Sequence, residues 1–146
     1  MINKILVAID GSEHSYKALT YALDIAEKFK APITLLNVFQ PVIVQSFLLQ
    51  PALPETISIN RDLIKFHQDL LAKTLENAKK AKPNISITAE LRQGDAAEQI
   101  LDAANSGGYD TIVFGHRGES RIEGFLMGSV SDKVSKHAQT TVIIVK

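Results

Sequence analysis

Short apolar runs alternate with amphipathic segments along almost the whole chain, and this alternation constrains the fold more than any other feature of the sequence. The runs have the composition of strands and comprise Ile5–Ile9, Ile33–Val38, Ile85–Leu91, Thr111–Phe114 and Thr141–Val145. A segment with helical periodicity lies between each strand and the next. Because strand–helix–strand units pair in parallel through right-handed crossovers, the sequence predicts one α/β domain over residues 1–146. Its core would be an open five-stranded parallel sheet with helices on both faces.

The strand predicted over Ile85–Leu91 differs from the others because its apolar and polar residues alternate. A period of two is typical of a half-exposed strand, so we expect this one at an edge of the sheet. The run Ile5–Ile9 is apolar throughout, which is typical of a strand covered on both faces.

Glycine, proline and capping residues mark the ends of the predicted helices. The residues expected on the buried helix faces are Ala18, Ala22, Ile25, Ala26 and Phe29, then Leu63, His67, Leu70, Leu71, Thr74, Leu75 and Ala78, then Ile100, Leu101 and Ala104, and finally Val130, Val134 and His137. Asp95 is expected to cap the third helix, with Glu98 three positions later, and Gly107 to end it.

The segment from Phe39 to about Ile59 shows no clear periodicity, and Pro41, Pro51 and Pro54 interrupt it. A connection of about twenty residues is uncommon in a compact domain and is usually functional or mobile. We interpret it as a mobile connection that packs a few apolar residues down. The alternatives are a lid, a partner contact or a regular element whose pattern is not recognised.

Charge and composition exclude several classes of protein. Sixteen basic residues balance sixteen acidic ones, so no overall positive field would attract nucleic acid or an anionic membrane. The first apolar run has only five residues, too few for a signal peptide or a membrane span. The chain has no cysteine, which is typical of a reducing compartment. We therefore predict a cytoplasmic protein that binds neither nucleic acid nor membranes.

Three glycines near the C-terminus form the pattern Gly115-x2-Gly118-x9-Gly128, and Ser129 follows directly. A phosphate chain binds well to convergent backbone N–H groups, which glycine leaves accessible, and to the N-terminus of a helix. The pattern therefore predicts a nucleotide phosphate site that suits ATP. A turn or a helix cap would also explain Gly115 or Gly118 individually.

The surroundings of this predicted phosphate site follow from the fold class. Positive charge would come from Arg117 or Arg121, because the overall composition supplies none. In open parallel sheets, ligands bind at the carboxyl ends of the strands, where the winding reverses. No two of the four histidines show a metal-ligand spacing, so a divalent cation, Mg²⁺ or similar, would be held mainly through the ATP phosphates.

Motifs for rapid NTP hydrolysis are absent from the sequence. There is no Gly-x4-Gly-Lys-[Ser/Thr] loop, and no Gly-x-Gly-x2-Gly follows the first strand. We predict binding rather than catalysis and assign no catalytic residue and no metal ligand. A slow ATPase or nucleotide-transferring enzyme that uses Asp10 or His116 is the alternative.

Five polar residues have more than one interpretation. Asp10 either contacts the ligand or serves the chain itself, as a cap of the first helix or an acceptor for loop amides. His67 and His137 are expected to be packed, hydrogen-bonded core or interface residues. His14, early in the first predicted helix, is expected to be solvated or to pack against a loop, with a general base as the alternative. His116 either contacts the nucleotide or has no ligand role.

Three features together resemble the universal stress protein family in its ATP-binding branch. They are the Gly-x2-Gly-x9-Gly-Ser pattern, a first strand that ends in Asp10, and a C-terminal Val-Ile-Ile-Val strand. The resemblance spans nearly all 146 residues and implies a Rossmann-like fold of the adenine nucleotide alpha hydrolase type. It also implies ATP between the ends of the first and fourth strands. One departure is Gln139-Thr140-Thr141, where members often carry a proline.

The resemblance also implies ligand contacts at matching positions. These are Ala8 and Asp10, with Ile9 between them, beside the adenosine, the main chain of Val38 beside the adenine, Phe114 and Gly115 beside the ribose, and Gly118, Gly128, Ser129 and Val130 beside the phosphates. Because the overall composition supplies no positive charge, we include Arg117 in the predicted site as its cation.

A homodimer through the last strand, Thr141–Val145, is expected on two grounds. The resemblance implies it, and an apolar strand left unpaired at a sheet edge would be an aggregation hazard that a symmetric partner covers.

We therefore predict a nucleotide-dependent regulatory module of the stress response. ATP occupancy would alter the 39–59 segment or the dimer surface that partners contact. The alternatives are the slow enzyme and a dimeric interaction scaffold without a ligand. The sequence leaves open the stress or pathway, the protein partners and the preference between ATP and AMP.

Overall fold

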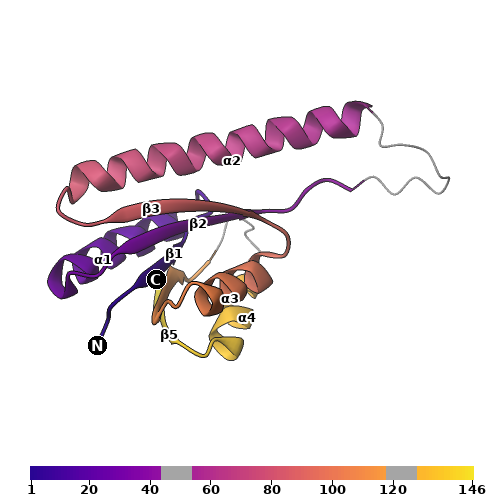
Figure 1. Ribbon diagram of the computed structural model, residues 1–146. Coiled ribbons are helices and arrows are strands. Elements are labelled where there is room, and N and C mark those ends of the chain that lie inside the picture. Colours follow the sequence, from indigo (N-terminus) through magenta and orange to yellow (C-terminus); the bar gives the residue numbers. More distant parts are fainter. Residues whose placement is uncertain (44–53, 118–127) are drawn as a thin grey trace.

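The computed structural model describes residues 1–43, 54–117 and 128–146. Strands and helices alternate along these ranges as the sequence predicts (Figure 1). The elements are β1 (Ile5–Ala8), α1 (Glu13–Phe29), β2 (Ile33–Phe39), α2 (Pro54–Ala81), β3 (Ile87–Gln93), α3 (Ala96–Ser106), β4 (Thr111–Gly115), α4 (Ser129–His137) and β5 (Thr141–Val145).

The sheet is parallel throughout and has the strand order β3-β2-β1-β4-β5. The predicted fold class, an open five-stranded parallel sheet, is confirmed, and so is the edge position of β3. β1 is central and pairs with both β2 and β4, with Ile5 opposite Ile33 on one side and Thr111 on the other. The chain winds outward from β1 in one direction and then returns to continue from β4 in the other. The winding therefore reverses between β1 and β4.

Helices cover both faces of the sheet, and the alternation of side chains along β1 sets the two halves of the core. Ile5, Val7 and Ile9 belong to a cluster that includes residues of α1 and α2. Leu6 belongs to a second cluster with residues of α3 and α4. Figure 1 shows this layering, with α2 on one side of the sheet and α3 and α4 on the other.

Side-chain caps fix the start of α1 and of α3. Ser12 caps α1, because its hydroxyl accepts a hydrogen bond from the Ser15 amide at 3.2 Å. The predicted cap of α3 is confirmed, since a carboxylate oxygen of Asp95 accepts from the Glu98 amide at 3.0 Å. Such caps satisfy N–H groups that have no partner within the helix.

The long helix α2 begins earlier than the sequence predicts. It starts at Pro54, so the predicted connection up to Ile59 is partly helical, and residues 44–53 lie outside the described ranges. Proline is tolerated in the first turn of a helix because the N–H that it lacks has no intrahelical partner there. Pro54 therefore starts the helix instead of interrupting a loop.

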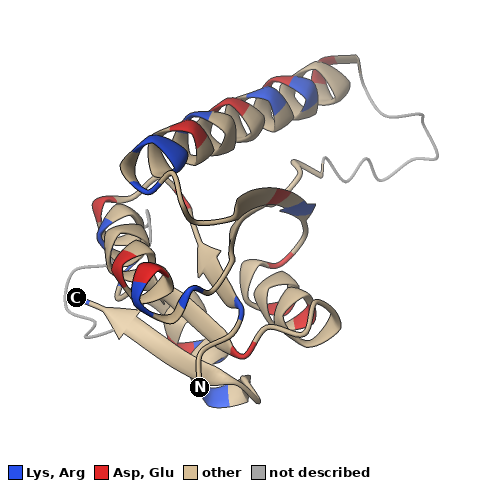
Figure 2. Ribbon diagram, turned by 60° about the vertical axis from the view of Figure 1, so that its left-hand side comes forward, with Lys and Arg blue, Asp and Glu red and all other residues tan. Residues whose placement is uncertain are grey.

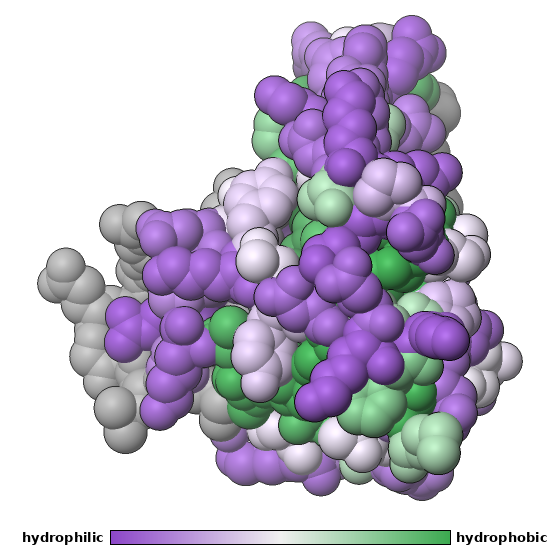
Figure 3. Space-filling model, turned by 90° about the vertical axis from the view of Figure 1, so that its left-hand side faces the viewer, coloured by the Kyte–Doolittle hydropathy of each residue, from purple (hydrophilic) through white to green (hydrophobic). Residues whose placement is uncertain are grey.

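The N-terminal half of α2 extends beyond the strands (Figure 1) and carries exposed apolar side chains at Ile57, Ile59 and Phe66. Charges of both signs are mixed along the helix (Figure 2), and Lys65 and Asp69 form one of its ion pairs. Viewed from its C-terminal end, the visible surface of α2 is mostly hydrophilic (Figure 3). The helix is thus mainly solvated, with Leu71 and Ala78 among the few residues that it buries.

Three of the residues expected on buried helix faces are instead exposed. Phe29 is 44% exposed, because it is the last residue of α1 and a helix end has neighbours on one side only. Val130 and His137 are also exposed, so His137 is not a core residue, and its alternative place at an interface stays a prediction. The nine-residue helix α4 packs through Ser131 and Val134, three positions apart, which turns Val130 and His137 away from the core.

The cap of α3 should make stability depend on pH. The hydrogen bond from the Glu98 amide is the main cause that lowers the pKa of Asp95, and the positive charge of Lys133 adds to it. A pKa lowered by folding means that the carboxylate stabilises the fold above the unfolded-state pKa near 4, and that this contribution is lost as the pH falls through the folded pKa.

We expect Asp95→Ala to lower the free energy of unfolding at pH 7 by about 1 kcal/mol, the usual effect of losing such a cap. Asp95→Asn keeps a capping oxygen but cannot titrate, so it should stay near the wild-type stability at pH 7 and lose less on acidification to pH 3. Urea unfolding at pH 7 and at pH 3 measures the free energy of unfolding of the wild type and both variants. Equal losses in the wild type and Asp95→Asn would contradict a role for the carboxylate charge.

Candidate functional site

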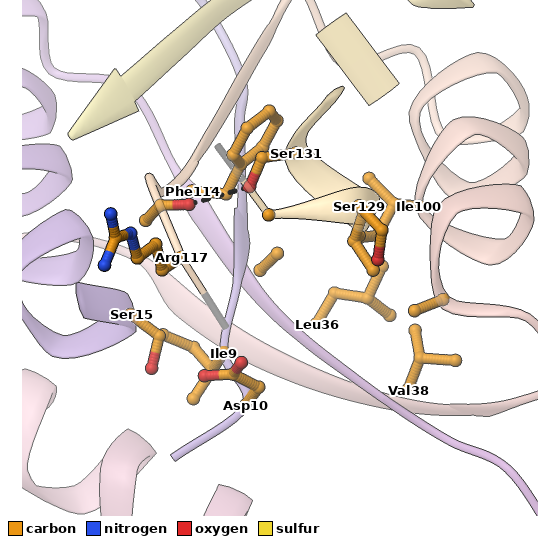
Figure 4. A pocket seen from close by; sticks show the side chains of 15 residues that line it. Ile9, Asp10, Ser15, Leu36, Val38, Ile100, Phe114, Arg117, Ser129 and Ser131 are labelled. Atoms are coloured by element: carbon orange, nitrogen blue, oxygen red, sulfur yellow. Dashed lines mark hydrogen bonds between the residues drawn. The ribbon is translucent and has the colours of Figure 1, made fainter. Parts of the chain in front are cut away.

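A cavity lies at the carboxyl ends of β1 and β4, where the winding of the sheet reverses. This is the expected ligand position in an open α/β sheet. Its volume is about 110 Å³, and several elements contribute side chains to it (Figure 4). The lining residues are Ala8, Ile9, Asp10, Ser15, Leu36, Val38, Ala96, Ile100, Phe114, Gly115, Arg117, Gly128, Ser129, Val130 and Ser131.

One side of the cavity is apolar and the other is polar. Leu36 and Val38 of β2 lie beside Ile100 of α3, and no charged group stands among them in Figure 4. Asp10 and Arg117 lie on the other side. The cavity can therefore hold a ligand that has a flat apolar part and a charged part.

The polar side begins where β1 ends. The Ile9 amide donates to the Leu36 carbonyl oxygen at 2.8 Å, which extends the pairing of β1 with β2 by one residue. Oδ1 of Asp10 accepts from the Ser12 amide at 2.9 Å and from the Ser12 hydroxyl at 2.6 Å. Asp10 thus accepts hydrogen bonds from its own loop, and Ser12, not Asp10, caps α1. Asp10 also lines the cavity, so a ligand contact stays a prediction.

The N-terminus of α4 forms the opposite wall. Gly128 is its cap residue and makes no side-chain cap bond, while its own amide donates to the His116 carbonyl oxygen at 3.0 Å. The hydroxyl of Ser131 is buried and donates to the Gly115 carbonyl oxygen at 2.9 Å, which ties the start of α4 to the end of β4. The first N–H groups of a helix have no intrahelical partner and, with the helix dipole, favour an anion.

Gly115 has a structural role that its place in the glycine pattern does not reveal. A Cβ atom at Gly115 would lie 2.6 Å from the carbonyl carbon of His14 and 2.7 Å from its carbonyl oxygen. The absence of a side chain thus allows the end of β4 to contact the first turn of α1. This packing explains Gly115 without a phosphate.

Cationic groups gather near the end of β4. Partial loss of hydration, followed by the positive charges of Arg117, Lys146 and His14, lowers the pKa of His116. His14 is half-buried, and its Nδ1 is a buried atom that has no hydrogen-bond partner in the part of the chain that the structure describes. Arg117 is the one of these four residues that lines the cavity, and its positive charge favours an anion on the polar side.

Ten of the eleven residues predicted to bind the nucleotide line this one cavity, and their contacts with a nucleotide stay predictions. The eleventh, Gly118, lies outside the described residues, as do Arg121 and the rest of 118–127.

Sequence reasoning missed some of the lining residues. They are Ser15, Leu36, Ala96, Ile100 and Ser131. Leu36 could have been found, because it lies two positions before Val38 and hence on the same face of β2. Ile100 was expected on a buried helix face, but no local signal tells which residues of α3 reach the ends of the strands.

The predicted environment of His67 is correct. Its Nδ1 lies 2.7 Å from Oδ1 of Asn37, and its ring packs against Phe39. Within the described ranges, no cluster of three His, Cys, Asp or Glu residues could hold a metal ion. No helix in those ranges is long and apolar enough to cross a bilayer.

Comparisons with known proteins agree with this fold. The model of the universal stress protein family matches residues 1–146. The chain belongs to the universal stress protein family. A relative, universal stress protein YxiE of Bacillus subtilis, is 37% identical over the full length of both chains.

Solved structures of universal stress proteins superpose over nearly the whole chain. UspA from Lactobacillus plantarum has a TM-score of 0.83 at 23% identity and covers 99% of this chain and 98% of its own. A universal stress protein in complex with cAMP has a TM-score of 0.70 at 25% identity and covers 99% of this chain and 97% of its own.

The close approach at Gly115 predicts that Gly115→Ala destabilises the protein without any ligand. Overpacking against a backbone usually costs about 1 to 3 kcal/mol, and we expect the upper part of that range because the neighbouring atoms belong to the main chain of α1.

Gly108→Ala is the control, since a Cβ there would meet no atom within 4 Å and would add only the strain of a left-handed φ of 65°. We expect a loss of about 1 kcal/mol for Gly108→Ala. Thermal unfolding of the ligand-free variants measures both. If Gly115→Ala were as stable as the wild type, the packing role of Gly115 would be wrong.

Proposed function

We propose that this universal stress protein is an ATP-binding regulatory module of the stress response. The observation that carries the proposal is the two-sided cavity at the winding reversal, with an apolar wall of Leu36, Val38 and Ile100 and a polar wall that ends at the N-terminus of α4. The family relative in complex with cAMP supports an adenine nucleotide as the ligand class.

The apolar wall suits the base of the nucleotide. Val38 of β2 and Ala96 and Ile100 of α3 line this wall together, and Ile100 is only 3% exposed. The cavity, which is partly open to solvent, has a volume of about 110 Å³ and is smaller than the roughly 300–1,000 Å³ of typical ligand pockets. It would therefore take the flat base, and the sugar and phosphates would extend along the polar wall.

The polar wall suits the phosphates. Gly128 presents backbone without a side chain, and Ser129 adds a hydroxyl at the first position of α4. Arg117 brings a guanidinium that can donate two hydrogen bonds to phosphate oxygens. A divalent cation, Mg²⁺ or similar, would be held through the phosphates of the nucleotide.

We propose that binding, and not turnover, is the function. The sequence holds neither a P-loop lysine nor a dinucleotide glycine motif. One oxygen of Asp10, the carboxylate at the site, already accepts two hydrogen bonds from Ser12. That arrangement suits a residue that shapes the loop better than a general base.

We further propose that the protein forms a homodimer through β5. This strand is at the edge of the sheet, and four of its five residues are half-buried and apolar (Val142, Ile143, Ile144 and Val145). A second copy would cover this edge. Light scattering should give twice the chain mass of 16.0 kDa at micromolar concentration. A monomer mass would contradict the proposal.

Titration calorimetry with Mg-ATP tests the binding proposal directly. We expect saturable binding by the wild type, and Arg117→Gln should raise the Kd by about tenfold, the effect of a lost charge-assisted hydrogen bond of about 1.5 kcal/mol. Adenosine, which has no phosphate, should bind both proteins equally.

Lys136→Gln is the matched control because it removes one positive charge from the exposed side of α4, where Lys136 pairs with Asp132. Its Kd for Mg-ATP should equal that of the wild type. An absence of heat and of saturation at millimolar Mg-ATP would refute the proposed function.

A further inference from the structure

A buried chain of hydrogen bonds connects the middle of α2 to the end of β1. Asn37 of β2 is only 1% exposed and lies between the two ends. Its Nδ2 donates to the Ile9 carbonyl oxygen at 2.6 Å, and its Oδ1 lies 2.7 Å from Nδ1 of His67. The chain therefore runs His67–Asn37–Ile9 and ends beside Asp10, which lines the cavity.

The chemistry of the three groups determines which atom donates and which accepts in each of these hydrogen bonds. A carbonyl oxygen only accepts, so the amide nitrogen of Asn37 must face Ile9 and its oxygen must face His67. Nδ1 of His67 must then carry a proton and donate. Each group depends on the next, because a buried polar group that loses its partner costs about 1 to 3 kcal/mol.

Packing holds the His67 ring in place for this contact. The ring stacks on Phe39 with centroids 5.6 Å apart and an angle of 26°, and the edge contact with Phe66 has a centroid distance of 5.4 Å. Phe39 is the last residue of β2, and Phe66 precedes His67 on α2. The histidine is therefore fixed by both elements that it joins.

A second contact joins α2 to the same end of β2. Asn60 accepts from the Val42 amide at 2.8 Å and donates to the Val42 carbonyl oxygen at 3.1 Å. Asn60 lies seven positions before His67, which is about two helical turns and hence the same face of α2. The middle of α2 and the exit of β2 are thus joined at two points.

The hydrogen bond from Asn37 to Ile9 orients a peptide group at the site. The peptide unit is planar, so the direction of the Ile9 carbonyl also sets the direction of the Asp10 N–H group. Asp10 and Ile9 both line the cavity. A change at His67 would therefore alter the backbone that faces the ligand.

We propose that His67 is a positioning residue of the nucleotide site, and that it acts through Asn37 on the peptide group between Ile9 and Asp10. This inference rests on the proposed ATP-binding function. It makes ATP affinity depend on how α2 sits against β2.

Another buried polar chain of the sheet does not reach the cavity. The hydroxyl of Tyr109 donates to Oγ1 of Thr34 at 2.7 Å, and Thr34 lies 3.0 Å from Oγ1 of Thr88. Thr34 and Thr88 lie in the first two residues of β2 and β3, near the opposite end of the sheet. Of these two chains, the one through Asn37 is therefore the one that can act on the ligand.

His67→Leu tests the proposal, because it keeps an apolar side chain between the phenylalanines and removes the donor to Asn37. We expect the Kd for Mg-ATP to rise on the order of tenfold in calorimetry at a temperature where circular dichroism shows a fully folded protein. His67→Gln supplies an amide donor and should restore most of the affinity.

Thr74→Val is the matched control on the same helix. Thr74 is 4% exposed, and its hydroxyl donates to the Leu70 carbonyl oxygen within α2 at 2.8 Å. Its replacement should lower stability and leave the Kd unchanged. An unchanged Kd in His67→Leu, with stability lowered as in Thr74→Val, would overturn the positioning role.

The double variant Asn37→Leu/His67→Leu tests the same hydrogen-bond chain from its other end. It removes the Asn37 oxygen that His67→Leu leaves without a donor, but it also takes the Nδ2 donor away from the Ile9 carbonyl oxygen, so stability should not recover relative to His67→Leu. The affinity for Mg-ATP should stay low, because Asn37 no longer orients the Ile9 carbonyl. Wild-type affinity in the folded double variant would contradict the proposal.

Amide NMR chemical shifts, measured without ligand, test the positioning role of His67 independently of ATP binding. The signals of Asp10 and Gly11 should move in His67→Leu and stay in place in Thr74→Val. If the wild type failed to bind Mg-ATP while these shifts moved in His67→Leu, the proposed ATP function would be wrong. The effect of His67 on the backbone at the end of β1 would still hold. Unmoved shifts would refute the positioning role whether or not ATP binds.

Discussion

The pairing of β1 with both of its neighbours is the constraint on which the rest of the structure depends. β1 has only four residues, yet it pairs with β2 and β4, and Ile5, Leu6 and Val7 are fully buried. Alternate side chains of β1 contact different helix layers, so this strand joins the two halves of the core. The same position makes β1 the point where the winding reverses, and a cavity forms at its end.

The cavity is therefore a consequence of the topology, while its chemistry comes from a few residues at the ends of elements. Asp10 lies in the turn between β1 and α1, Gly115 ends β4, and Gly128 precedes α4, where backbone groups leave the pattern of the sheet or helix. Each of them has a structural role. Asp10 accepts a hydrogen bond from the Ser12 amide, and the Gly128 amide donates to the His116 carbonyl oxygen. Gly115 has no side chain and so allows the close approach of His14. In this protein, the residues that could hold a ligand are also the residues that close the turns.

Local patterns predicted the elements and failed where tertiary contacts decide burial. The period of two over Ile85–Leu91 correctly predicted an edge strand, and Asp95 was correctly identified as a cap. Phe29 and His137 fit a helical apolar face but lie at helix ends, where no element covers them. The start of α2 at Pro54 was missed because a proline that begins a helix and a proline that breaks one look the same in a sequence.

The sequence by itself determined the order of strands and helices, the fold class and the phosphate end of the predicted site, because hydrophobic periodicity and glycine positions are local properties of the chain. The resemblance to the universal stress protein family implied most of the other predicted lining residues. Only the tertiary structure decided which face of each element is covered, that Ile100 and Ser15 reach the cavity, and that Gly115 is needed for packing against α1. It alone joined His67 to Ile9 through Asn37. These residues are distant in sequence, and the register of the parallel strands, which no local pattern encodes, brings them together.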